Sequence, residues 1–227
     1  MVIPNAVWGI YTDATLDYMI ALKNCNPAKK IINFEDDGEG IYKADLIINA
    51  LYQDPLLSQM KAGKDYYICA KTFMFYNAIN VKDKVENVFI SFGGADPQNY
   101  TDRLLEIINK DKYSQYNFKV VIGRAKENIK QLMEYNKYEN IEVLYDIKNM
   151  PEIMSSCDIG ITSRGRTGYE LAILGISTIS MAQNAREDRE DKQKQLLTHD
   201  LRKGRKRVLN LINSLYGGKY EKTIYYS

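Results

Sequence analysis

The stretch from Asp158 to Met181 constrains the fold most, because it predicts two strands joined through a helix. The strand DIGITS leads into a polar turn at 163–167, an amphipathic helix is expected to begin near Gly168, and the strand STISM follows Gly175. Parallel strands need a crossover of this kind. The turn is therefore expected at the carboxyl edge of a parallel sheet, where open α/β sheets bind ligands.

The same turn has the chemistry of an anion site. Gly165 precedes a helix start, where free backbone N–H groups and the positive end of the helix dipole attract phosphate. Arg164 and Arg166 add guanidinium groups, which bind phosphate in a bidentate way. The dipole alone explains Glu170 in the first helical turn, but its two oxygens also suit both hydroxyls of a ribose.

Strands and helices alternate from Asn87 onward, which predicts a doubly wound parallel sheet. The strand NVFISFGG is nearly continuously apolar, as is typical of a strand buried on both faces. Asp96 as N-cap and Pro97 at the first position predict the start of the next helix. The five expected strands are 87–94, 118–123, 141–146, 158–163 and 177–181, with further helices around 129–133 and 150–157.

Residues 1–78 are expected to form a partial Rossmann-like domain, and residues 79–227 a nucleotide-binding Rossmann-like domain. The polar stretch 77–86 is the predicted linker. The second domain is expected to end with a solvated, charged helix at 185–195 and an apolar-striped helix that packs on the sheet. In the first domain the sequence predicts a helix at 16–23 and strands at 7–12, 31–34, 44–52 and 66–70.

Other strand ends carry weaker candidates for binding. The pair Gly93-Gly94 would let a substrate approach the backbone, although a tight connection is the favoured explanation of this motif taken alone. Arg124, after Gly123, is by itself best explained as a solvated side chain. The amides of Gln183 and Asn184 suit sugar hydroxyls, and loop polarity is the alternative.

The composition narrows the class of protein. A net charge of +2 argues against a broad nucleic-acid-binding surface. Three widely spaced cysteines predict reduced thiols in a cytoplasmic protein, and neither a zinc site, a transmembrane segment nor a signal peptide is expected.

Other polar residues are weak candidates for a site. His199 is interpreted as exposed, and Asp36-Asp37 as a turn instead of a hydrolase pair. The basic run 202–207 is interpreted as a solvated helix start, with an anionic membrane surface as the alternative.

These features, in this order, resemble the nucleotide-binding half of GT-B-type sugar-nucleotide proteins. The chain is most similar to the spore coat polysaccharide biosynthesis glycosyltransferase-like family, which includes the UDP-2,4-diacetamido-2,4,6-trideoxy-altropyranose hydrolase of pseudaminic acid biosynthesis. The peptidoglycan N-acetylglucosaminyltransferase is a more distant likeness. The resemblance spans residues 7 to about 187, and the matching segments are FEDDGEGIYKADLIINALY (34–52), DYYICAKTF (65–73), ISFGGADPQNYT (90–101), NMPEIMSSCDIGITSRGRTGYELAILGISTIS (149–180) and AQNARE (182–187).

The resemblance implies a role for each matching position. The segment ending at Met150 would contact the base, and the start of the helix would hold the diphosphate. Glu170 would bind the ribose, and Gln183 and Asn184 would face the donor sugar. The nucleotide-binding set implied by the resemblance and the strand ends is Gly93, Gly94, Gly123, Arg124, Met150, Gly165, Arg166, Thr167 and Glu170.

The sequence also departs from the pattern of this family at several positions. The family opens with a Gly-x-Gly-His turn that supplies the implied catalytic base, and nothing before residue 12 matches it. Arg166 replaces a small hydroxyl residue of many relatives. We therefore expect a GT-B-like protein with a truncated N-terminal domain and no assigned catalytic residue, cofactor or metal. The expected activity is metal-independent hydrolysis of a UDP- or CMP-linked sugar, or transfer of that sugar in surface polysaccharide or glycan biosynthesis. The alternative is a non-catalytic binding module, and an exposed edge of the N-terminal sheet predicts a homodimer or a covering partner.

Overall fold

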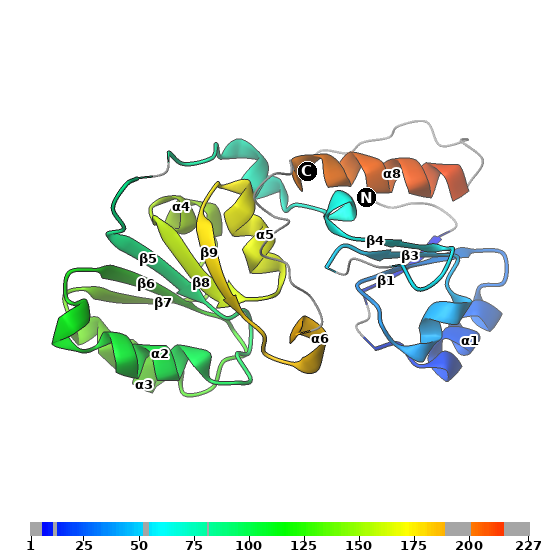
Figure 1. The fold of residues 1–227 in the computed structure, drawn as a ribbon. Helices are drawn as coiled ribbons and strands as arrows, with labels where there is room; N and C mark the ends of the chain where they lie inside the picture. The colour runs from blue at the N-terminus through cyan, green and yellow to red at the C-terminus, as the bar shows by residue number, and fades with distance from the viewer. Residues whose placement is uncertain (1–5, 11–12, 52–54, 81, 189–200, 216–227) are drawn as a thin grey trace. The chain divides into compact units, whose positions relative to one another are not determined.

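The computed structural model describes residues 6–10, 13–51, 55–80, 82–188 and 201–215. These residues form two compact units, each built on a parallel sheet (Figure 1). The first unit contains the described residues up to Cys69 and those from Leu201 onward. The second contains the described residues from Ala70 up to the gap that precedes Leu201.

The sheet of the first unit has the order β1-β2-β3-β4, and all its neighbouring strands are parallel. Its strands are β1 (Ala6–Ile10), β2 (Lys30–Phe34), β3 (Leu46–Asn49) and β4 (Met60–Ala62). The expected strand at 66–70 is wrong. Its aromatic and β-branched residues gave a strand pattern, but the backbone of Tyr67 packs instead against Gly204, where a Cβ atom would lie within 2.9 Å of the Tyr67 nitrogen.

Helices cover both faces of this sheet: α1 (Leu16–Cys25) on one and α8 (Gly204–Leu215) on the other. Adjacent strand residues point to opposite faces. Ile31 therefore joins the apolar cluster beneath α1, and Ile32 joins a second cluster with Val208 of α8. The last helix thus completes the first unit, whereas the sequence placed it in a domain of residues 79–227.

The sheet of the second unit has the order β7-β6-β5-β8-β9, again with every neighbouring pair parallel. This confirms the expected doubly wound sheet. In Figure 1 the helices α2 and α3 lie on one face, and α4 and α5 on the other. The elements are β5 (Asn87–Ser91), α2 (Tyr100–Ile108), β6 (Asn117–Ile122), α3 (Ile129–Met133), β7 (Ile141–Tyr145), α4 (Met150–Ser155), β8 (Ile159–Ser163), α5 (Arg166–Ile173), β9 (Ser177–Met181) and α6 (Ala185–Asp188).

Short 3-10 helices occupy several connections of both units. They are η1 (Glu39–Lys43), η2 (Lys64–Tyr66), η3 (Lys71–Phe75), η4 (Asp111–Tyr113), η5 (Glu134–Lys137) and η6 (Leu201–Lys203). Part of the expected linker packs on the second unit, because the Ile79 N–H donates to the carbonyl of Leu174 at 2.8 Å.

Two helix starts differ from the expected ones. Helix α2 begins at Tyr100, four residues beyond Asp96, which has a left-handed φ of 45°. The Asp96 carboxylate still caps the helix, since it accepts from the N–H groups of Tyr100 and Thr101 at 2.9 Å each. Helix α5 begins at Arg166, so Glu170 lies in its second turn. Of the expected helix at 185–195, only Ala185–Asp188 is described; His199 lies outside the described residues.

Candidate functional site

The topology of the second unit creates a switch point between β5 and β8. From β5 the chain proceeds to β6 and β7 on one side, and β8 and β9 lie on the other. The connections that leave the carboxyl ends of β5 and β8 therefore diverge, which is where doubly wound sheets bind ligands. The connection after β5 contains Gly93-Gly94, and the one after β8 contains Gly165.

The glycine turn after β5 faces open space. Gly93 has a left-handed φ of 80°, and a Cβ atom built on Gly93 or Gly94 would meet no atom within 4 Å. Gly123 packs behind the turn: its Cβ atom would lie 2.5 Å from the carbonyl oxygens of both glycines. The Ala125 N–H also donates to the Gly94 carbonyl at 3.1 Å. Close packing thus explains Gly123, whereas Gly93 and Gly94 present a bare backbone.

The start of α5 combines a cation with a partly buried acid. Gly165 is the N-cap and has no side-chain oxygen to accept from the first N–H groups of the helix. Arg166 is exposed at the first helical position, and Thr167 beside it is partly buried. Burial raises the pKa of Glu170 to about 7, and the nearby Arg166 charge opposes the shift. The Arg166 guanidinium is therefore close enough to Glu170 to favour the charged form of its carboxyl group.

The raised pKa of Glu170 predicts a pH-dependent stability. Because the folded pKa of about 7 exceeds the ordinary 4.5, the unfolded chain loses this proton first as pH rises. The folded protein should lose up to about 2–3 kcal/mol between pH 4.5 and 7, and nothing more from this group above that range. Glu170→Gln should abolish this loss and unfold at a higher temperature than wild type at pH 8. Equal pH profiles for the two proteins would contradict the prediction.

The end of β9 is tied to the glycine turn and to α5. Gln183 is 7% exposed, and its Nε2 donates to the Phe92 carbonyl at 2.8 Å, while its Oε1 is buried without a hydrogen-bond partner. Its backbone N–H donates to Glu187 Oε2 at 3.0 Å. The other carboxylate oxygen, Oε1, lies 3.9 Å from the Cβ position of Gly165. Asn184 is exposed and caps α6 by accepting from the Glu187 N–H at 2.9 Å.

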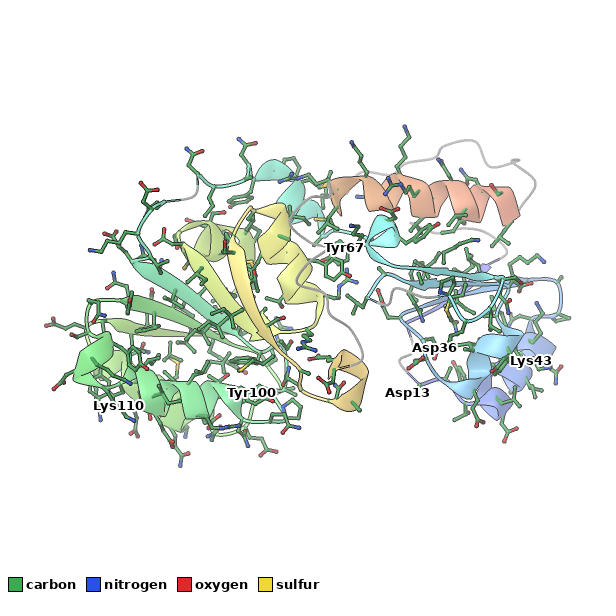
Figure 2. All side chains as sticks on the ribbon, in the orientation of Figure 1. Asp13, Asp36, Lys43, Tyr67, Tyr100 and Lys110 are labelled. Carbon is green, nitrogen blue, oxygen red and sulfur yellow. The ribbon has the colours of Figure 1, made fainter. Side chains whose placement is uncertain are left out.

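Three residues that hold this arrangement together were missed by the sequence analysis. Gln98 Nε2 donates to the Gln183 carbonyl at 2.9 Å, and the Tyr100 hydroxyl donates to the Ala182 carbonyl at 2.8 Å. Figure 2 shows Tyr100 at the start of α2. Glu187 is the third. The available signal for Glu187 was its position in the sequence, four residues after Gln183 and shortly after the end of β9.

Arg124 and Met150 lie apart from this group. The Arg124 Nε donates to the Asp146 carboxylate at the end of β7, and β5 separates β6 from β8 in the sheet. Met150 begins α4, and the preceding Asn149 accepts from the Tyr76 hydroxyl at 3.3 Å. The structure thus gathers Gly93, Gly94, Gly123, Gly165, Arg166, Thr167, Glu170, Gln183 and Asn184 around β5, β8 and β9, with Arg124 and Met150 toward β7.

The described residues contain neither a candidate metal cluster nor a membrane-spanning helix. No group of three or more His, Cys, Asp or Glu side chains there is arranged to hold a metal ion. No helix among them has the length and apolar character needed to cross a bilayer.

Sequence comparison gives one partial relative and no family assignment. No protein-family model matches the sequence. The uncharacterized protein MJ1062 of Methanocaldococcus jannaschii is 31% identical over 180 residues, which covers 69% of this chain and 36% of that protein. The chain therefore spans little more than a third of the length of this relative.

Structural comparison defines the fold. The kitacinnamycin glycosyltransferase matches with a TM-score of 0.52 at 11% identity, over 93% of this chain and 76% of its own. The HepE protein of Anabaena, solved with UDP and glucose, matches with a TM-score of 0.50 at 10% identity, over 94% and 77%. The chain has an α/β fold of the GT-B type, as the sequence predicted.

Proposed function

We propose that this chain binds a nucleotide-activated sugar at the carboxyl edge of its second sheet and hydrolyses it or transfers the sugar. The observation that carries the proposal is the start of α5, where Gly165 and Arg166 precede the partly buried Glu170 by one helical turn. The backbone N–H groups of a helix start and a guanidinium suit a diphosphate. A carboxylate one turn further along suits the two hydroxyls of a ribose.

The neighbouring strand ends support the same assignment. The open backbone at Gly93 and Gly94 leaves room for a ligand beside the start of α5, because β5 and β8 are adjacent. Gln183 and Asn184 follow β9 on the other side of β8, and we assign the sugar hydroxyls to the exposed Asn184, because the buried Gln183 amide donates to the Phe92 carbonyl. Arg124, in contrast, is turned toward Asp146, and we assign it a smaller role.

The structural neighbours support a glycosyltransferase-like class. One is a glycosyltransferase, and the other was solved with UDP and glucose, so UDP is the first nucleotide to test. We further propose that this chain belongs to the spore coat polysaccharide biosynthesis glycosyltransferase-like family and that its reaction needs no metal ion. In that reaction the helix dipole and Arg166 would stabilise the departing nucleoside diphosphate.

Binding without turnover is the alternative, since none of the site residues described above is assigned as a catalytic base. Pairing of two copies along an edge of the first sheet stays a prediction. Light scattering at micromolar concentration tests the pairing independently of the site.

A nucleotide screen followed by product analysis tests the proposed function. UDP, CMP and GDP are compared by thermal shift, and a ligand at ~100 times its dissociation constant should add about 2.7 kcal/mol of stability. The matching sugar nucleotides are then incubated with the protein, and free sugar or transferred sugar is measured. Stabilisation with turnover supports the enzyme, and stabilisation alone supports the binding module. If no nucleotide stabilises the protein, the proposed function is wrong.

A further inference from the structure

The helix α6 brings a carboxylate to the start of α5. Glu187 Oε2 accepts from the Gln183 backbone N–H at 3.0 Å, and Oε1 lies 3.9 Å from the Cβ position of Gly165. Asn184 fixes this helix from its own N-terminus, because its Oδ1 accepts from the Glu187 N–H at 2.9 Å. The carboxylate is therefore held in place by hydrogen bonds at both its side chain and its backbone.

A second acid of α6 contacts the same turn. Arg164, which precedes Gly165, forms an ion pair with Asp188, with Nη1 and Oδ1 3.4 Å apart. The same nitrogen donates to the Asp188 backbone carbonyl at 3.4 Å. Both acids of α6 thus lie against the turn that the proposed function assigns to a diphosphate. Their negative charge offsets part of the positive potential of the helix start and of Arg164.

We propose that Glu187 is a specificity-determining residue that makes this site prefer a sugar-linked diphosphate to the free nucleoside diphosphate. This inference rests on the proposed function. A sugar nucleotide carries one negative charge on each phosphate, whereas the free diphosphate carries one more above the phosphate pKa of about 6. A fixed carboxylate beside the site repels the extra charge of the product. It therefore weakens product binding more than substrate binding and favours product release.

Coulomb's law sets the size of the effect. At the partly solvated edge of a protein, one added unit charge several ångströms from a carboxylate changes a dissociation constant by roughly fivefold. The side chain of Glu187 is partly buried, so the repulsion is only partly screened by water. Neutralising Glu187 should therefore tighten free diphosphate binding most.

Calorimetric titration of Glu187→Gln tests the inference, with UDP, UDP-glucose and inorganic pyrophosphate as ligands at pH 8. Glutamine keeps an oxygen that accepts from the Gln183 N–H, so the fold is preserved. The ratio of the UDP and UDP-glucose dissociation constants should fall about fivefold relative to wild type. Glu142→Gln, an exposed acid on β7 at the opposite edge of the sheet, should leave the ratio unchanged.

The outcomes separate the two proposals. If both nucleotides bind and the ratio is equal in wild type and Glu187→Gln, the charge-selecting role is wrong and the proposed function stands. If nucleotides do not bind but the variant binds pyrophosphate at least about fivefold tighter, Glu187 does limit anion binding and the nucleotide assignment is wrong. If neither protein binds any of the three ligands, both proposals are wrong.

Discussion

Replacing Lys126 by methionine is expected to lower the free energy of unfolding by about 3–5 kcal/mol, because it leaves the buried Asp96 and the partly buried Asp102 carboxylates without their cation. The Lys126 side chain is 1% exposed. Its Nζ lies 2.6 Å from Asp102 Oδ2 and 3.4 Å from Asp96 Oδ2, and it donates to Asn99 Oδ1 at 2.5 Å. Asp96 in turn caps α2, so the ion cluster fixes the whole connection that follows the glycine turn.

The charge state of Asp102 supports this account. Burial raises the pKa of Asp102, but hydrogen bonds from Lys126 and Asn128 outweigh it and hold the pKa below its usual value. The carboxylate is therefore charged at neutral pH and depends on its partner. Denaturant unfolding of Lys126→Met measures the loss, and exposed Lys110→Met is the matched control, expected within about 0.5 kcal/mol of wild type. A loss under about 1 kcal/mol for Lys126→Met would contradict the prediction.

Gly123→Ala should destabilise the second unit by about 3 kcal/mol, at the upper end of the cost of overpacking. The added methyl group would lie 2.5 Å from the carbonyl oxygens of Gly93 and Gly94, and backbone atoms cannot rotate away as a flexible side chain can. The glycine turn must shift, so the variant should also bind nucleotide more weakly. Thermal unfolding measures the first effect and titration the second.

Gly94→Ala, compared with Gly123→Ala, separates an effect on ligand binding from an effect on stability. Its methyl group would meet no atom within 4 Å, so stability should stay within about 0.5 kcal/mol of wild type. The same methyl group would occupy the space through which a ligand approaches the backbone, and affinity should fall at least about tenfold, or roughly 1.4 kcal/mol. Unchanged affinity in Gly94→Ala would show that the ligand does not approach this turn. A neutral Gly123→Ala would show that the two connections are not packed as described.

The strands of the second sheet could be predicted because each is a short apolar run bounded by a turn signal. The sequence expected a strand at 141–146, for example, and β7 is Ile141–Tyr145. Burial on both faces produces such runs without reference to any other part of the chain. Their alternation with helices then predicted a doubly wound parallel sheet, but not the order of its strands.

Long-range contacts could not be predicted in this way. Gln183 and Phe92 are 91 residues apart, and their hydrogen bond exists only because β9 and β5 end at the same edge. Lys126 is buried against Asp96 and Asn99 of another connection and against Asp102 of α2, and this grouping leaves no local pattern in the sequence. The last helix has an ordinary apolar stripe, which indicates that it packs on a sheet but not on which one.

In the candidate site too, residues in a contiguous sequence pattern could be predicted, and residues brought in by long-range contacts could not. Gly165, Arg166 and Glu170 could be found because a strand, a turn and a helix start are contiguous in sequence. Glu187 was missed because its meaning depends on α6 folding back beside Gly165. Arg124 was included on position alone, and only its ion pair with Asp146 shows that its guanidinium is directed toward β7.

The most direct test of the account is a titration cycle at Glu170. The nucleoside diphosphate that gives the largest thermal shift and its 2′-deoxy form are each titrated into wild type and Glu170→Gln. The account predicts that loss of the hydroxyl weakens binding by about tenfold or more in wild type, the value of a hydrogen bond to a charged group, and by less than about threefold in the variant. The variant is expected to be at least as stable as wild type at pH 8, so unfolding would not explain its loss. An equal penalty in both proteins would contradict the claim that the start of α5 binds a nucleotide with Glu170 on the ribose.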